Sequence, residues 1–245
     1  MVVRCRPLNR KETADGRARI IEMDKRQGQV TLQNKADAGK EPPKAFTFDA
    51  VFDWESTQRE VYENTAAGIV NSTLEGYNGT VFAYGQTGTG KTHTMEGYSA
   101  DSTQQGIIPQ AFDHIFKAIE ASADTQYLVR ASFLEIYNEE IRDLLSKSPK
   151  DKLELKEHKD SGVYVKGLNA FVVKSVPEIK NVLEVRLSCQ HTRAVQRHSF
   201  NHEHYTGSCG SRAGQHDPLW AAVRVACSGW PVRLLHAPST NPNSL

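Results

Sequence analysis

Apolar residues recur along residues 1–185 with two spacings, one typical of β-strands and one typical of helices. Alternation of apolar and polar residues predicts short strands at 2–6, 19–23, 29–33, 46–48, 51–52, 153–155, 163–165 and 171–173. Denser apolar runs predict a buried strand at 80–84 and a long central strand at 127–137. Apolar residues three and four positions apart predict helices at 57–75, 109–119 and 175–183, with a short helix at 139–145.

Helix starts carry their own signals. Thr57 with Glu60, and Ser175 with Glu178, fit the capping box in which a hydroxyl and a carboxylate bond the first free amides. Residues 35–43 and 98–105 are polar and are predicted to be loops. Because strands and helices alternate, the fold class is predicted to be α/β, with a central β-sheet that carries helices on both faces. Ligands of such sheets bind beyond the carboxyl ends of the strands.

A phosphate-binding pattern, G-x-x-x-x-G-K-[ST], follows the predicted strand at 80–84. Its glycines allow positive φ, so that main-chain N–H groups converge on phosphate oxygens. The lysine is expected to reach the β- and γ-phosphates and the final threonine to hold Mg²⁺. A helix predicted from residue 92 supplies the required context, which a Gly/Thr-rich surface loop would lack. The eight residues are Gly85, Gln86, Thr87, Gly88, Thr89, Gly90, Lys91 and Thr92.

Composition narrows the class of protein. The chain has 245 residues, 38% apolar and 24% charged, with a net charge of +1, as in a soluble globular protein of one or two domains. The near-zero charge predicts neither nucleic acid nor an anionic membrane as a partner. No apolar run is long enough to span a bilayer, and residues 1–4 do not form a secretory signal. Four cysteines without a C-x-x-C pair favour a reducing cytoplasmic setting.

Composition changes abruptly near residues 185 and 186. The last lysine is Lys180, whereas six of the nine histidines and three of the four cysteines follow Arg186. We therefore divide the chain into residues 1–185, which form the domain, and 186–245, an aberrant or poorly ordered tail. The tail shows no sustained apolar period and is expected to leave the central strands unpaired.

With these motifs in place, the chain resembles the motor domain of kinesins. The glycine-rich loop has the narrower form found in that family, and so do residues 76–80 before it and 93–95 after it. Residues 4–7, Arg-Cys-Arg-Pro, match the R-x-R-P element, and residues 133–145 match a further signature. The segments at 153–157 and 162–166 are most similar to heterotrimeric kinesins that work in cilia. The resemblance covers residues 1–185.

The resemblance implies a P-loop NTPase-type fold, incomplete at the C-terminus, that binds ATP or ADP with Mg²⁺. It implies an ATP hydrolase that moves along microtubules, in the cytoplasm on the cytoskeleton and in the cilium. Arg4, Arg6 and Pro7 would line the adenine and ribose side, and His93 would stack on the base. The hairpin residues Lys156, His158, Lys159 and Lys166 could face tubulin, or could form a solvated charged hairpin.

Kinesins sense the γ-phosphate with two switch elements, N-x-x-S-S-R-S-H and D-L-A-G-S-E. Arg193, Val195, Ser199 and Asn201 keep the spacing that leads into the first, but His202 follows and neither motif is present. The chain is therefore either a motor ATPase by descent or a nucleotide-binding fragment without turnover. A small-molecule kinase would need an arginine-rich lid, which is not visible. A reading-frame shift or a mis-spliced gene model explains the change near 185, and a genuinely divergent C-terminal region is the alternative.

Overall fold

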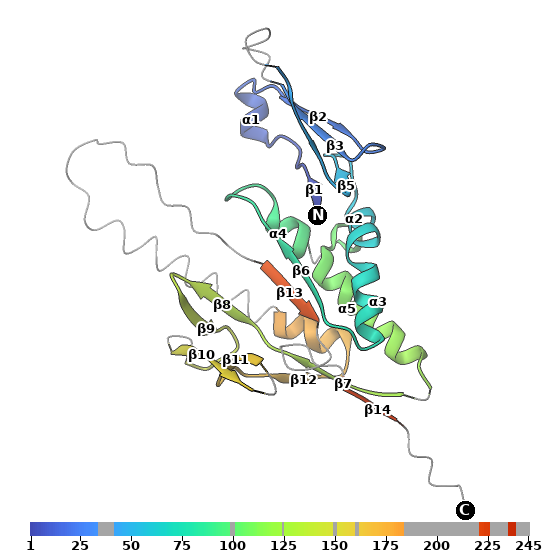
Figure 1. Ribbon diagram of the computed structural model, residues 1–245, viewed down its shortest axis with the longest axis vertical. Helices are drawn as coiled ribbons and strands as arrows, with labels where there is room; N and C mark the ends of the chain where they lie inside the picture. Colours follow the sequence, from blue (N-terminus) through green and yellow to red (C-terminus); the bar gives the residue numbers. More distant parts are fainter. Residues whose placement is uncertain are drawn as a thin grey trace, which may run out of the picture.

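Strands and helices alternate along residues 1–183, as the apolar pattern predicts (Figure 1). The computed structural model describes residues 1–33, 42–98, 101–123, 125–148, 151–159 and 162–183, and the main chain at 221–225 and 235–238. Most of the predicted loop at 35–43 lies outside these ranges. Within them, no helix combines the length and the apolar character that crossing a membrane requires.

The N-terminal strands build the lobe at the top of Figure 1. β1 (Val2–Arg4) pairs in parallel with β5 (Ala50–Phe52), and α1 (Arg10–Ala14) follows β1. β2 (Ile21–Asp24), β3 (Gln29–Leu32) and β4 (Lys44–Thr47) form an antiparallel sheet, which confirms the predicted hairpin. Its turn requires Gly28, because φ is +64° and a Cβ there would lie 2.3 Å from the Phe48 carbonyl oxygen.

The helix predicted at 57–75 is two helices, α2 (Gln58–Thr65) and α3 (Ala67–Leu74), separated at Ala66. The predicted cap is present, since the Thr57 hydroxyl accepts a hydrogen bond from the Glu60 amide at 3.1 Å. The break follows Thr65, whose hydroxyl donates to the Val61 carbonyl at 2.5 Å. A hydroxyl bonded to the preceding turn bends a helix, a tertiary detail that the apolar period does not report.

The core lies where α2, α3 and α5 (Ile107–Ala121) meet β7 (Thr125–Ala131) and β12 (Phe171–Val173). α5 turns one apolar face into this core, and it begins two residues before Pro109, the predicted start. Residues 176–183 are helical, as predicted, and bring Ile179, which is fully buried, to the same cluster. The core side chains of α5 are Ile107, Ile108, Ala111, Phe112, Ile115 and Phe116.

The strand that leads into the glycine-rich loop, β6 (Gly79–Ala83), is less buried than its apolar run predicts. Phe82 is 64% exposed and no residue of β6 is fully buried, so the prediction of a buried strand is wrong. A central strand is buried only when strands flank both its edges and elements cover both faces. Among the described residues, the strand paired with β6 is β13 (Ala221–Val225).

The tail supplies one strand to each of two sheets, contrary to expectation. β13 runs antiparallel to β6, and β14 (Leu235–Pro238) runs antiparallel to β7, which also pairs with β12. The prediction that the central strands stay unpaired is therefore wrong at these two edges. The described strands form five separate hydrogen-bonded sheets rather than one continuous sheet.

A four-stranded antiparallel sheet occupies the lower left of Figure 1, in the order β11, β10, β9, β8. β8 (Leu134–Tyr137) and β9 (Glu140–Asp143) replace the predicted helix at 139–145, so that prediction is wrong. Asn138 and Glu139 have φ of 50° and 64°, the conformation of a two-residue hairpin turn, which a helix cannot accommodate. The predicted strand at 127–137 is accordingly divided into β7 and β8. The remaining strands are β10 (Lys152–His158) and β11 (Gly162–Lys166).

A close main-chain approach joins α4 (Lys91–Met95) to the start of α5. The Gly106 amide donates to the Glu96 carbonyl at 3.0 Å, and a Cβ on Gly106 would lie 2.5 Å from the Met95 carbonyl carbon. Between the two helices lies the short 3₁₀-helix η2 (Ser102–Gln104), inside the predicted polar loop. Only glycine permits this spacing, because the neighbouring atoms are main chain and cannot rotate away.

We expect Gly106→Ala to lower the free energy of unfolding by about 1–3 kcal/mol, the usual cost of forcing an extra methyl into packed atoms. The matched control is Gly68→Ala in α3, where an added Cβ meets nothing within 4 Å. That substitution should be neutral or stabilising, since alanine favours a helix over glycine. Urea denaturation of both variants measures the difference, and equal stability would refute the close approach.

Candidate functional site

The loop at 85–92 has the main-chain conformation that its glycines predict. Gly85, Gly88 and Gly90 have φ of 155°, 83° and 101°, values that side-chain-bearing residues rarely adopt. A Cβ on Gly85 would lie 2.6 Å from the Thr89 hydroxyl, so the turn also needs the space. Turns of this kind direct successive N–H groups to one side, an arrangement that binds anions.

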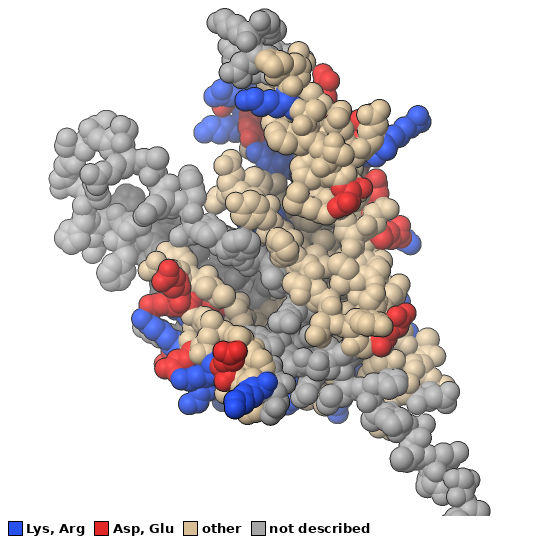
Figure 2. All heavy atoms as spheres, in the orientation of Figure 1, with Lys and Arg blue, Asp and Glu red and all other residues tan. Residues whose placement is uncertain are grey.

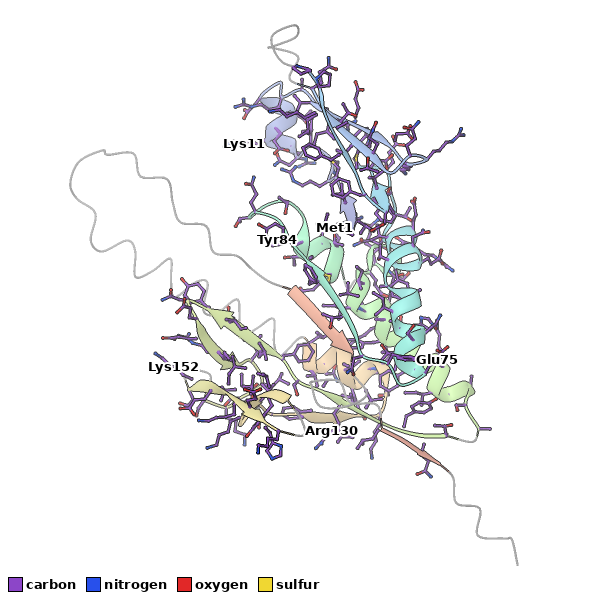
Figure 3. All side chains as sticks on the ribbon, in the orientation of Figure 1. Met1, Lys11, Glu75, Tyr84, Arg130 and Lys152 are labelled. Atoms are coloured by element: carbon purple, nitrogen blue, oxygen red, sulfur yellow. The ribbon has the colours of Figure 1, made fainter. Side chains whose placement is uncertain are left out.

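Lys91 begins α4 directly after the loop, and its ammonium group folds back over it. The Nζ atom donates to the Gly85 carbonyl at 2.7 Å and to the Gln86 carbonyl at 3.0 Å. Thr92, the next residue, is exposed at the start of the helix. Figure 3 labels Tyr84, which marks the point where β6 ends and the loop begins. The lysine is therefore held at the mouth of the loop by main-chain oxygens.

Arg6 joins the N-terminal lobe to the same loop. Its Nε donates to the Gly88 carbonyl at 2.7 Å, while its terminal nitrogens donate to both oxygens of Glu12 at 2.6 and 2.7 Å. Glu12 also accepts from the Asn9 amide in the capping box of α1. The hydrogen bonds from Arg6 and then from Asn9 lower the pKa of Glu12 to about 2, so the pair is charged at neutral pH.

Arg4 is more deeply buried than Arg6. Its guanidinium donates to the Gln58 side chain at 2.7 Å, to the Thr94 hydroxyl at 3.0 Å and to the Ser56 carbonyl at 3.4 Å. Burial lowers the pKa of Arg4, and Glu60 partly opposes that effect. The group stays cationic, since an arginine pKa lies far above neutral pH. Arg4, the last residue of β1, thus links this strand to the start of α2 and to α4, and these bonds fix its orientation.

His93 joins this network through its carbonyl, which accepts from the Gln58 side chain, and its ring contacts an aromatic neighbour. Its ring centroid is 5.5 Å from that of Tyr98, and the two planes are tilted by 57°. Burial, with a further contribution from the Arg4 cation, lowers the pKa of His93, so the imidazole is neutral at pH 7. The predicted stacking of His93 on a base stays a prediction, and Tyr98 contacts the His93 ring without lining the cleft.

A cleft of about 1250 Å³ runs from the glycine-rich loop between β1, α2 and α5. That volume exceeds the range of 300–1000 Å³ usual for small-ligand pockets. Arg4, Arg6, Pro7, Thr89, Gly90 and His93 all line it, so the structure brings the predicted base-side residues to one cleft. Lys91 and Thr92 lie next to it, on the loop itself.

The predicted tubulin-facing residues lie on another part of the molecule. Lys156, His158 and Lys166 share one face of the β10–β11 pair by its register, and Lys159 follows in the turn. All four are exposed. The basic residues alternate with acids, and Lys156 pairs with Glu154 at 2.8 Å. Figure 2 shows blue and red side chains intermixed over these strands rather than a purely basic patch.

Comparison with known proteins decides the family. The family model of the kinesin motor domain matches residues 4–205. The chain belongs to the kinesin motor domain family. The match extends past Val185, the predicted end of the domain, into the segment where Asn201 keeps the motif spacing. The division at 185 itself stays a prediction.

Individual kinesins agree with this assignment. The chain is 56% identical over 195 residues to kinesin-like protein KIF3C of Bos taurus, covering 80% of this chain and 24% of that protein. KIF3C of Mus musculus is 56% identical over 185 residues. A solved structure of a fast kinesin, described with its ATPase mechanism and its interactions with microtubules, superposes with a TM-score of 0.72 at 41% identity. It covers 79% of this chain and 53% of that chain, and it confirms the predicted fold class.

The relatives are much longer than this kinesin chain. The chain spans 24% of the KIF3C proteins of Bos taurus and Pongo abelii, and 23% of those of mouse and rat. What those proteins do as wholes therefore comes to this chain only as a proposal.

Sequence reasoning missed four residues that shape the site: Gln58, Glu12, Thr94 and Tyr98. Glu12 could have been found, because Asn9-x-x-Glu12 is a capping box and places a carboxylate near Arg6. Gln58 follows the predicted N-cap Thr57, but its neighbours in space come from three other segments. No local sequence motif identifies such a residue.

Proposed function

We propose that this kinesin chain binds ATP and ADP with Mg²⁺ in the cleft and on the 85–92 loop, as the nucleotide-binding part of a microtubule motor. The single observation that carries the proposal is the lysine at the loop mouth, held by Gly85 and Gln86 carbonyls beside three glycines of positive φ. A cation and convergent N–H groups are what polyphosphate oxygens require.

Thr92 is the proposed Mg²⁺ ligand. Its side chain is exposed one residue after Lys91, at the start of α4, and its hydroxyl would hold Mg²⁺ beside the phosphates. The donor is a hard hydroxyl oxygen, the kind of ligand that Mg²⁺ prefers beside phosphates and water. Mg²⁺ would supply charge neutralisation of the polyphosphate. In the described part of the chain, no group of three or more acidic, histidine or cysteine side chains is placed to hold a metal by itself.

The base side of the proposed nucleotide site is the wall formed by Arg4, Arg6, Pro7 and His93. A purine needs a flat partner, and the His93 ring, which lines the cleft, is proposed to supply it. Arg6 donates a hydrogen bond to Gly88 of the loop, and this bond connects the base side to the phosphate side. Adenine and ribose are thus proposed to occupy the cleft while the phosphates lie on the loop.

Microtubule binding and the place of action are proposed from the family. Kinesins hydrolyse ATP and move along microtubules, so the cytoskeleton is the expected site, with the cilium favoured by the similarity of residues 153–166 to ciliary kinesins. The exposed face that carries Lys156, His158 and Lys166, with Lys159 in the turn, is the candidate tubulin contact. Because acidic residues alternate with the basic ones, a solvated charged hairpin accounts for this surface equally well.

The second candidate function is a nucleotide-binding fragment without motor activity. The observation that favours it is the sequence after Asn201, where the serines and arginine of the first switch are replaced by His202, Glu203 and His204. Nucleotide binding does not need these groups, whereas hydrolysis does. The two candidates therefore share the binding site and differ in turnover.

Titration of the chain with ADP in the presence of Mg²⁺, followed by calorimetry, tests the proposed site. We expect saturable binding of one ADP, and much weaker binding when a chelator removes Mg²⁺, because the phosphate charge is then unscreened. The control is a nucleoside without phosphates, which should bind weakly if the loop supplies most of the affinity. Absence of ADP binding to the folded chain would refute the proposal.

A further inference from the structure

Gln58 lines the cleft, although no motif includes it. It is the first residue of α2 and only 3% of its surface is exposed. Its side-chain oxygen accepts from Arg4 at 2.7 Å, and its side-chain nitrogen donates to the His93 carbonyl at 2.6 Å and the Gln104 carbonyl at 3.2 Å. Both donors of the amide and one lone pair of its oxygen are therefore used.

Two neighbours hold the main chain of α2 at Gln58. Thr57 caps α2 and sets the helix start, so that the residue after it points into the cleft wall. The Gln110 side chain donates to the Gln58 carbonyl at 3.3 Å and to the Gln105 carbonyl at 2.8 Å. A buried amide is costly unless it is fully bonded, so this arrangement tolerates few alternatives.

The partners of the Gln58 amide share one property, which is that each belongs to the cleft. Arg4, His93 and Gln104 all line it, from β1, α4 and η2 in turn. A glutamine that only filled the core would bond whatever lay nearby. Gln58 instead joins the three segments that surround the place where a base would enter.

Arg4 shows what the connection achieves. Apart from Gln58, its side-chain partner is the Thr94 hydroxyl at 3.0 Å, so the planar guanidinium is held from two sides. The His93 main chain is held by the same amide, one residue from Thr94. When the groups of a site are already in place, ligand binding is not weakened by the cost of ordering them.

We propose that Gln58 is a positioning residue of the base side, holding Arg4 and the His93 main chain in the arrangement that receives the nucleoside. This inference rests on the proposed nucleotide-binding function and adds a residue that specifies the base rather than the phosphates. The hydrogen bonds of the Gln58 side chain go to Arg4, His93 and Gln104 rather than to the loop at 85–92, so its effect should be confined to ligands that carry a base and a sugar.

The test compares two ligands, Mg·ADP and Mg·pyrophosphate, by calorimetry on the chain and on Gln58→Leu. Leucine keeps most of the volume and removes all three hydrogen bonds. We expect the affinity for ADP to fall about tenfold, the usual effect of losing a hydrogen bond to a charged group, while the affinity for pyrophosphate stays within about twofold. A general loosening of the fold would weaken both ligands together, because both use the loop at 85–92.

Matched variants make the comparison specific. Asn64→Leu removes an amide of the same helix that bonds the Glu60 carbonyl at 2.8 Å and does not line the cleft, and it should leave both affinities unchanged. Thr94→Val removes the other side-chain anchor of Arg4 and should weaken ADP but not pyrophosphate. Gln58→Glu keeps an acceptor for Arg4 but turns its second oxygen toward two main-chain carbonyl oxygens, so it should weaken ADP as Gln58→Leu does and leave pyrophosphate within about twofold. If Gln58→Leu does not fold, these last two variants carry the test.

The outcomes separate the inference from the function beneath it. Equal weakening of ADP and pyrophosphate in the Gln58 variants, or no weakening of ADP, overturns the positioning role while leaving nucleotide binding intact. Failure of the unsubstituted chain to bind either ligand overturns the proposed function instead. A loss of ADP affinity in Asn64→Leu as large as that in Gln58→Leu would also overturn the role assigned to the Gln58 amide.

Discussion

Lys91→Ala should lower the affinity of the chain for Mg·ADP by about 30-fold or more. Truncating one partner of a hydrogen-bonded charge pair costs about 2–5 kcal/mol, and each 1.4 kcal/mol is a factor of ten in the dissociation constant. Lys91 is the cation at the loop mouth, and its Nζ has only main-chain carbonyls to exchange for phosphate oxygens. The loss should therefore appear as affinity rather than as unfolding.

Calorimetric titration of the variant with Mg·ADP measures this effect. The matched control is Lys11→Ala, an exposed lysine of α1, which Figure 3 places at the N-terminal lobe away from the glycine-rich loop. Lys91→Arg adds a second comparison, since it keeps the charge but replaces a compact ammonium by a planar fork. Equal ADP affinity in the unsubstituted chain and Lys91→Ala would remove the loop from the binding site.

Local patterns predicted the elements whose stability is local. The β2–β3 hairpin and α5 carry their own apolar period, and Thr57 caps α2 where the pattern places it. The positive φ values of the 85–92 loop follow from its glycines alone. In each case the residues that decide the structure lie within one or two turns of one another.

The helix predicted at 139–145 shows where such reasoning fails. Glu140 and Leu144 belong to a stretch rich in helix-forming residues, yet Ile141 pairs with Ile136 across a hairpin and is buried. Propensity is worth a few tenths of a kcal/mol per residue, whereas burying an apolar side chain contributes more. The pairing of β9 with both β8 and β10 therefore outweighs the local preference.

The candidate site divides in the same way. Residues 85–92 and Arg4, Arg6, Pro7 and His93 carry motifs and were predicted together. The connection of Gln58 to Arg4 and His93 spans 54 and 35 residues along the chain, and it exists only because β1, α2 and α4 meet. A sequence reports which residues carry chemistry, but the fold decides which buried amide holds them.

Microtubules should not increase phosphate release by this 245-residue kinesin chain. Stepping along a track requires that hydrolysis be fast, and hydrolysis requires groups that place the attacking water and bind the γ-phosphate oxygens. In kinesins these groups come from N-x-x-S-S-R-S-H and D-L-A-G-S-E. Neither is in the sequence, and the residues after Asn201 offer His202, Glu203 and His204 in their place.

The expected size of the deficit is large. Loss of a single donor aimed at developing charge lowers turnover about 100- to 1000-fold, so a chain without either switch should show less than about 1% of a motor's stimulated rate. Steady-state phosphate release, measured with and without microtubules, tests this, with a KIF3C motor domain as the active control. ADP binding measured on the same preparation establishes that the site is intact. Stimulation comparable to that control would mean that the tail after Val185 supplies a water-positioning group, and it would favour the motor function over the fragment without turnover.

If the stimulation is absent, the transcript across residues 185 and 186 distinguishes the remaining explanations. A one- or two-base shift that restores both switch motifs would assign the deficit to the reading frame rather than to a divergent protein.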